Sequence, residues 1–224
     1  MQEIIREREG KGKRAGNSIF ASKIRCGQCG SWYGPKVWHS TDQYRRVIWQ
    51  CNSKFKEKTR CGTPHVTEKQ IEEAFIKAVN KLIGDRDYYI RELRSVMDAL
   101  SDTSALEAER ASLDPQIESE ALTIREAVAE NARIAQDQEE FRKKYDEMVA
   151  KYNSLISQRD AIQSQIDEKI DRREKIGRFI RQVEALPALI TEFDAALWAA
   201  LIESVTIETD GRIVFHLTCG TEIE

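Results

Sequence analysis

The sequence predicts an α+β protein: a small four-cysteine module with β-hairpins and helices, carrying a long inserted antiparallel coiled-coil hairpin. Three observations lead to this fold. Four cysteines cluster near the N-terminus, a long coiled-coil repeat occupies the middle of the chain, and short strand and helix patterns return after Pro187. The four cysteines are Cys26, Cys29, Cys51 and Cys61.

Composition limits the classes of protein to consider. The chain has 224 residues, of which 33% are charged and 41% hydrophobic, enough for one large or two small domains. The most apolar window, 185–202, is interrupted by Glu192 and Asp194, so no membrane span is expected. Charged residues precede any apolar run at the N-terminus, which argues against a secretory signal. We therefore expect a soluble, cytoplasmic protein with no membrane partner.

The net charge of −3 conceals two oppositely charged regions. Residues 1–65 contain 14 Lys/Arg and 5 Asp/Glu, whereas residues 66–224 contain 21 Lys/Arg and 33 Asp/Glu. An asymmetry of this size indicates two modules with different partners. The basic module is expected to attract polyanions.

The cysteines of the basic module are spaced as metal ligands. In Cys26-Gly27-Gln28-Cys29, the two-residue spacer lets backbone amides donate to both thiolates. Residues 31–39 and 44–51 are rich in aromatic and β-branched residues and predict two strands joined by the turn 40–42. A cysteine pair, a hairpin and two further cysteines are the plan of a zinc ribbon, which holds one structural zinc ion.

Several alternatives stay open at this point. The same ligands would suit iron, a redox dithiol could use Cys-x-x-Cys, and the thiols could be unrelated core residues. His39 or His65 could replace one cysteine as a ligand. Cys219 stands apart near the C-terminus and is expected to be a packed strand residue.

Basic residues on or beside the predicted hairpin are the candidate nucleic-acid contacts. Lysine ammonium groups in a loop suit phosphates. Successive residues of a strand point to opposite faces, so only one of Arg45 and Arg46 can lie on the side that faces the groove. A solvated basic surface on a protein-binding ribbon is the alternative interpretation. The candidates are Lys11, Lys13, Arg14, Lys36, Arg45, Arg46, Lys54, Lys56, Lys58 and Arg60.

Helical periodicity begins after the ribbon. Thr67 is a candidate N-cap for a helix that buries Ile71, Phe75, Val79 and Leu82 and ends at Gly84. A second helix is expected from Asp85 to about Leu100.

The coiled-coil repeat is strongest from 138 to 185. Thirteen positions spaced alternately four and three residues apart, from Phe141 to Val183, include ten apolar residues. A shorter partner seam precedes this helix, with Pro115 expected in an early turn or at a kink. Residues 131–137 break the pattern and predict the tip, with Ile134 exposed. The partner seam consists of Leu106, Leu113, Ile117, Ile124 and Val128.

The C-terminal region returns to compact structure. Residues 193–202 predict an amphipathic helix, and 205–217 predict a β-hairpin with a type I′ turn at Asp210-Gly211. This hairpin needs a sheet to join, which makes the coiled coil an insertion within one domain. The expected divisions are a basic linker (1–17), a first ribbon part (18–103), the coiled-coil hairpin (104–186) and a closing part (187–224).

The sequence contains no recognisable catalytic constellation. It has no phosphate-binding glycine loop, no His-x-x-x-His and no serine beside a plausible base. His216 lies in a predicted strand and is expected to be structural. We therefore expect no catalytic residues and no small-molecule substrate.

Several segments resemble the zinc-ribbon region of large serine recombinases. The order of ribbon, inserted coiled coil and returning hairpin is also similar to that family, from about Ser18 to Glu224. The segments that carry the resemblance are 18–30, 49–51, 61–65, 193–198, 205–207 and 220–223, with Gly211, Ile213 and Phe215.

The resemblance implies part of a phage-type integrase or mobile-element recombinase, in a bacterium or its phage. In that family, a separate N-terminal domain cuts DNA, the zinc domain binds the attachment site and the coiled coil pairs with other subunits. By this resemblance, residues 1–17 correspond to a linker, and Asn131, Ile134 and Phe141 are candidate pairing residues at the tip. The implied partners are double-stranded DNA, other subunits and a directionality factor.

A zinc-stabilised coiled-coil scaffold that binds only proteins is the alternative function. It would be favoured by a ribbon surface without net positive charge. The excess of Lys/Arg in residues 1–65 argues against it.

Overall fold

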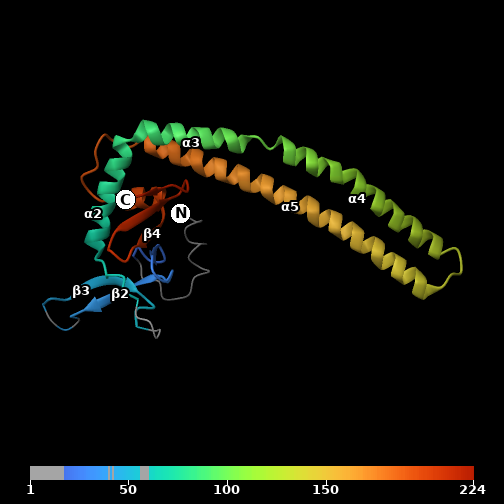
Figure 1. Cartoon of the computed structure of the whole chain (residues 1–224), viewed down its shortest axis with the longest axis horizontal. Coiled ribbons are helices and arrows are strands. Elements are labelled where there is room, and N and C mark those ends of the chain that lie inside the picture. Colours follow the sequence, from blue (N-terminus) through green and yellow to red (C-terminus); the bar gives the residue numbers. More distant parts are fainter. Residues whose placement is uncertain (1–17, 40, 42, 56–60) are drawn as a thin grey trace. The chain divides into compact units, whose positions relative to one another are not determined.

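The computed structural model describes residues 18–39, 41, 43–55 and 61–224 (Figure 1). The chain divides into two compact units. The first combines the chain up to Leu93 with Lys175–Glu224, and the second is Arg94–Glu174. The α+β class is confirmed, because short sheets occur together with a long helical segment. The divisions expected at 103/104 and 186/187 stay predictions.

The first unit contains two small sheets. One has the strand order β1 (Ile24–Cys26), β4 (Ile202–Ile207), β5 (Ile213–Leu217) and β6 (Glu222–Ile223). The other pairs β2 (Tyr33–Trp38) with β3 (Arg46–Cys51) in antiparallel fashion, which confirms the predicted hairpin. The C-terminal hairpin joins the ribbon through β1, which pairs in parallel with β4 (Ile24 with Val205 and Cys26 with Ile207).

The turn of the β4–β5 hairpin differs from the prediction. A type I′ turn needs positive φ at both central residues, and only Gly211 has it, at +91°. The amide of Gly211 donates to the carbonyl of Glu208 at 3.1 Å, so Thr209 and Asp210 are the central residues. The amide of Glu208 donates to the carbonyl of Arg212. This bond closes a three-residue loop, 209–211, in which Gly211 takes the left-handed position. The type I′ prediction was wrong because it misplaced the turn by one residue.

Two helices follow the ribbon as predicted: α2 (Glu68–Gly84) and α3 (Arg86–Ser101). Thr67 caps α2 in a capping box, in which its hydroxyl accepts from the amide of Gln70 and the Gln70 side chain accepts from the amide of Thr67. The predicted apolar face of α2 is fully buried. Phe75 from this face packs against Trp198 and Phe215, so α2 and the terminal hairpin share one aromatic core.

Polar contacts hold the returning segment within the first unit. Arg86 donates to the carbonyls of Leu186 and Pro187, at 2.9 and 3.2 Å, just after a long helix ends. Asn80 forms two hydrogen bonds of 2.8 Å with the backbone of Ile190. The chain then enters α6 (Ala195–Leu201), whose N-terminal amides are capped by Asp194.

The helices of the predicted arm are α4 (Ser104–Asn131) and α5 (Gln138–Glu184). In the second unit they pack through an apolar cluster of Leu113, Ile117, Ile162 and Ile166. They run antiparallel, because Arg110 bonds to Gln163 and Lys151 to Glu120. The predicted tip lies between the two helices, as expected.

Two details of the arm depart from the prediction. Pro115 lies well inside α4, so the early-turn placement was wrong and the alternative of a kink stays a prediction. Its side chain faces solvent, where the backbone carbonyl that proline leaves without an N–H partner can be hydrated. Val128 was assigned to the seam but is 47% exposed. Ala127 and Asn131 are more buried in the last turns of α4, so the seam has shifted by one position there.

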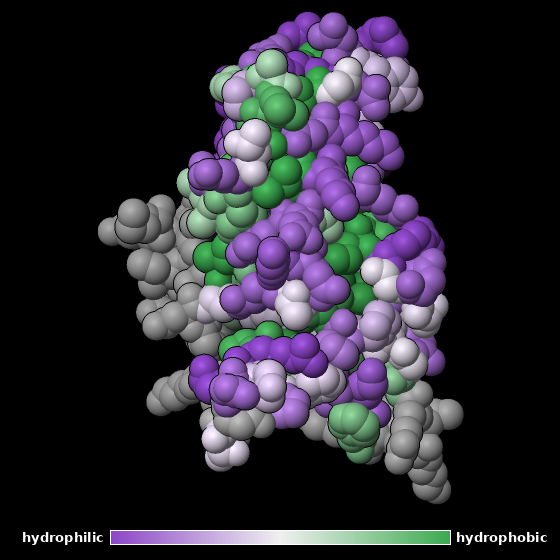
Figure 2. Space-filling view, turned by 90° about the vertical axis from the view of Figure 1, so that its left-hand side faces the viewer, coloured by the Kyte–Doolittle hydropathy of each residue, from purple (hydrophilic) through white to green (hydrophobic). Residues whose placement is uncertain are grey.

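One face of the described structure is mainly polar. Figure 2 shows charged and polar side chains over most of one face, with apolar side chains reaching the surface in separate patches. Within the described residues, none of the helices combines the length and hydrophobicity that crossing a bilayer requires.

Candidate metal centre and nucleic-acid interface

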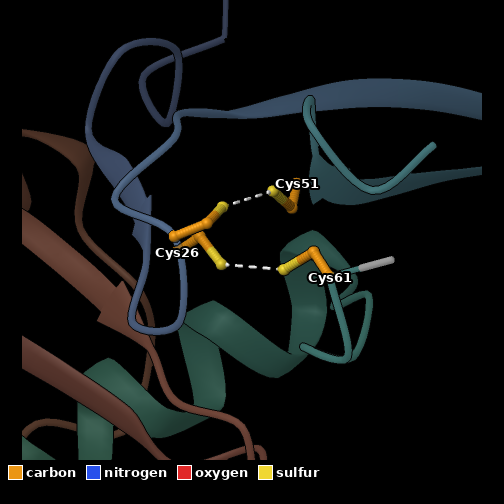
Figure 3. A group of neighbouring side chains, drawn as sticks. Cys26, Cys51 and Cys61 are labelled. Carbon is orange, nitrogen blue, oxygen red and sulfur yellow. Dashed lines mark hydrogen bonds between the residues drawn. The ribbon is translucent and has the colours of Figure 1, made fainter. Parts of the chain in front are cut away.

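The four predicted cysteine ligands converge on one point. Their Sγ atoms all lie within 4.8 Å of one another. The Sγ atoms of Cys26 and Cys61 are 3.2 Å apart (Figure 3), and those of Cys29 and Cys51 are 3.4 Å apart. Four sulfurs about 2.3 Å from a central zinc would be separated by about 3.8 Å, so this arrangement fits a tetrahedral ion.

Short, tightly turned segments place these ligands. Cys26 ends β1, its carbonyl accepts from the amide of Gly30 at 2.8 Å, and Gly30 takes a left-handed φ of +69°. Cys51 ends β3. Among the described residues the cluster contains only the four cysteines, and the ring of His65 instead packs on Trp38 at 4.5 Å.

The thiols do not ionise equally. Burial would raise the pKa of Cys29, but hydrogen bonds from Ser31 and neighbouring thiols lower it to about 7. Burial raises the pKa of Cys51 to about 12, and the adjacent Cys29 adds to the increase. Four thiolates therefore require a cation to balance their charge, and binding it must release protons.

Three of the predicted DNA contacts lie on the β2–β3 hairpin. Lys36 and Arg46 are exposed on β2 and β3, and Arg45 is exposed immediately before β3. Arg46 pairs with Trp38 across the strands, so both point to the same face, and its guanidinium lies 5.4 Å from the Trp38 ring. Lys36, two residues before Trp38, shares this face. We call Lys36, Trp38 and Arg46 the cationic face.

The other predicted contacts are placed differently. Lys54 Nζ donates to the carbonyl of Thr63 at 2.8 Å, so this ammonium group is engaged inside the ribbon. Arg25, which the sequence analysis did not select, is exposed and lies 3.9 Å from the ring of Trp32. Lys11, Lys13, Arg14, Lys56, Lys58 and Arg60 lie outside the described residues.

The candidate pairing residues lie at the tip of the arm. Ile134 is 57% exposed, as expected. The side-chain oxygen of Asn131 accepts hydrogen bonds from Gln136 and Gln138 at 2.7 and 3.1 Å, which braces the turn. Phe141 is partly buried and stacks on Tyr145.

Two residues given structural roles are partnered or packed within the first unit. His216 contacts Thr206 through Nε2 at 2.7 Å and Glu222 through Nδ1 at 3.1 Å, which ties together three strands. Cys219 is buried, and burial raises its pKa. It lies in the turn after β5, so its predicted place in a strand was wrong.

The polar side chains around the metal ligands were not predicted from the sequence. Gln28, Ser31, Ser53 and Thr63 each follow a cysteine by two residues. Each cysteine is followed by Gly or Asn and then by a polar residue. This repeated pattern was a signal that could have identified them.

The arrangement of four thiols beside a β-hairpin defines a zinc ribbon with one structural zinc site. Residues 19–80 match the family described as the recombinase zinc beta ribbon domain, so this part of the chain is similar to that family, in agreement with the resemblance seen in the sequence. A solved structure described as "Crystal Structure of a LSR-DNA Complex" is similar at 15% identity and a TM-score of 0.34, over 96% of this chain. The chain spans 61% of the length of that protein. No curated protein sequence matched.

Proposed function

We propose that this chain is the DNA-binding, synapsis-controlling C-terminal region of a site-specific serine recombinase. The zinc ribbon would bind attachment-site DNA, and the coiled-coil arm would pair with other subunits. The observation that carries this proposal is the cationic face on a ribbon similar to that of the recombinase family. Strand cleavage would belong to a different domain of the parent protein.

The chemistry of the cationic face supports binding to a duplex. A two-stranded β-ribbon fits the major groove, where arginine can bond to guanine or to a phosphate. Packing on Trp38 limits the motion of the Arg46 side chain, so less conformational entropy is lost when it binds. Lys36 supplies a second positive charge on the same side of the hairpin.

The arm supports a separate role. It is a long apolar-seamed hairpin that ends in an exposed isoleucine, and exposed apolar side chains at such an end suit contacts with another protein. A directionality factor would be a further partner of this arm.

DNA binding can be tested by fluorescence anisotropy with a mixed-sequence duplex over a salt series. The double variant Lys36→Glu/Arg46→Glu should bind at least about tenfold more weakly, and its log–log salt slope should fall by about 0.9 for each phosphate that is no longer neutralised. Lys69→Glu is the matched control, because Lys69 is an exposed lysine on α2 whose side chain is 82% accessible. It should bind like the unmodified protein.

Equal affinity of the double variant and the control would refute the role of the cationic face. No DNA binding by the zinc-loaded protein would instead favour the protein-only scaffold.

The role of the arm can be tested by pairing of DNA-bound subunits in a gel-shift assay. Ile134→Asp should weaken pairing without changing affinity for a single duplex. Ile170→Asp is the control, because Ile170 is a 45% exposed isoleucine on α5, away from the tip. If single-site affinity fell with Ile134→Asp, the tip would contact DNA or support the fold, and the pairing role would be wrong.

A further inference from the structure

A polar residue accompanies every cysteine of the metal centre. Backbone hydrogen bonds reach the sulfurs of Cys26, Cys29, Cys51 and Cys61 from the residue two positions later in each case. These residues are Gln28, Ser31, Ser53 and Thr63. The same local turn therefore supports each of the four sulfurs.

The side chains of these residues link the two halves of the centre. The hydroxyls of Ser31 and Ser53 are 2.7 Å apart. The side-chain oxygen of Gln28 accepts from the amide of Gly62 at 2.6 Å. Each link joins the segment of the first two cysteines to the segment of the last two.

Thr63 makes the most direct link. Its hydroxyl lies 3.2 Å from the sulfur of Cys26 and 3.1 Å from that of Cys61. The residue is 0% exposed, and a buried hydroxyl is costly unless it is hydrogen-bonded. With both cysteines ionised, the hydroxyl proton can be donated to either sulfur.

The backbone of Thr63 also binds a positively charged group, the ammonium of Lys54. Its carbonyl accepts the Lys54 ammonium group at 2.8 Å. A zinc ion with four thiolates carries a net charge of −2, so a nearby cation stabilises the loaded centre.

We propose that Gln28, Ser31, Ser53 and Thr63 form a polar second layer that positions the thiolates and sets how tightly the ribbon holds zinc, with Thr63 as the principal positioning residue. The inference depends on the metal centre and is independent of DNA binding. Groups that orient metal ligands typically change metal affinity about 10–100-fold when they are removed.

The test is competition for Zn²⁺ between the full chain and a chromophoric chelator, without DNA. Thr63→Val keeps the shape of the side chain but removes the hydroxyl, and its zinc affinity should fall about 10–100-fold. Thr63→Ser restores the hydroxyl and should stay within about threefold of the unmodified protein, since it keeps the bond that orients the ligands. Co²⁺ provides a second readout, because its thiolate charge-transfer band reports the ligand geometry directly.

Thr206→Val is the matched control. It removes a partly buried threonine hydroxyl from the same unit, but that hydroxyl bonds to His216 and not to a cysteine. Its zinc affinity should be unchanged. The proposal fails if Thr63→Val binds zinc as tightly as the unmodified protein, or if Thr63→Ser loses as much affinity as Thr63→Val, because the shape of the side chain would then matter and not its hydroxyl.

Discussion

The zinc ribbon and the helical arm are stabilised in opposite ways. In the ribbon, strands of two to six residues are held by contacts between distant parts of the sequence, such as Cys26 with Cys61. In the arm, helices of 28 and 47 residues pack through a seam repeated along their length. The ribbon therefore depends on a few irreplaceable groups, whereas the arm distributes its stability over many similar ones.

Because of this difference, a change that unfolds one region should leave the other region folded. Loss of metal should affect the ribbon, and loss of apolar packing in the second unit should affect the arm.

Removing a ligand should give the largest effect. Cys51→Ser should abolish zinc retention and DNA binding, because metal binding supplies about 10 kcal/mol or more of folding free energy in small zinc modules. The helices of the arm should remain, since their core contains no metal ligand. Zinc stoichiometry, DNA anisotropy and far-UV circular dichroism measure the three quantities. Full DNA affinity in the metal-free protein would break the predicted dependence of the ribbon on zinc.

Zinc affinity should rise steeply with pH. The pKa of Cys51 is raised to about 12 and that of Cys26 is also raised by burial, so both thiols are protonated near neutral pH and must release protons on binding. Two released protons already correspond to an affinity gain of about 100-fold per pH unit, and Cys29, with a pKa of about 7, adds to the gain at the lower end of the range. Chelator competition between about pH 6 and 8 measures this dependence, with the helicity of the arm as the internal control. A flat profile would contradict the assignment of protonated thiols.

A core truncation should affect the arm alone. Ile166→Ala removes a side chain from the apolar cluster of the second unit and should lower its free energy of unfolding by about 2–4 kcal/mol. The exposed Ile170→Ala should change it by less than about 0.5 kcal/mol. Urea unfolding monitored by circular dichroism compares the two variants. Loss of zinc from Ile166→Ala would show that the two regions are coupled.

The smallest expected effect concerns a helix cap. Thr67→Ala removes one half of the capping box of α2 and should cost the first unit about 1 kcal/mol. Thr103 occupies the same position before α4 but makes no capping hydrogen bond, so Thr103→Ala should cost much less. Similar losses for both variants, measured by thermal unfolding, would show that helix propensity and not capping controls these positions.

The sequence could predict the arm because its structure follows from local periodicity. The predicted seam from Phe141 to Val183 lies inward at nearly every position, although Arg173 is exposed. Near the tip the repeat weakens, and Val128 was misplaced because little apolar surface defines the register there.

The ribbon could be predicted only in part. The spacing of four cysteines was enough to identify the metal centre, and Thr67 and Gly84 marked the limits of α2. The pairing of β1 with β4 could not be predicted, because a three-residue strand has no pattern that specifies a distant partner. The contacts of Thr63 likewise depend on the folded positions of Cys26 and Cys61, which no single segment determines.

The pairing of β1 with β4 also bears on how the protein is made. About 180 residues separate Cys26 from Val205, and at about 5–20 residues per second a ribosome needs about 10–40 s to synthesise them. During this interval the parallel partner of β1, β4, has not yet been made, whereas helices form in microseconds. Antiparallel pairing of α4 with α5 would shorten the loop that must close, which lowers its entropic cost. Early folding of the arm would therefore favour the pairing of the late strand β4 with the early strand β1.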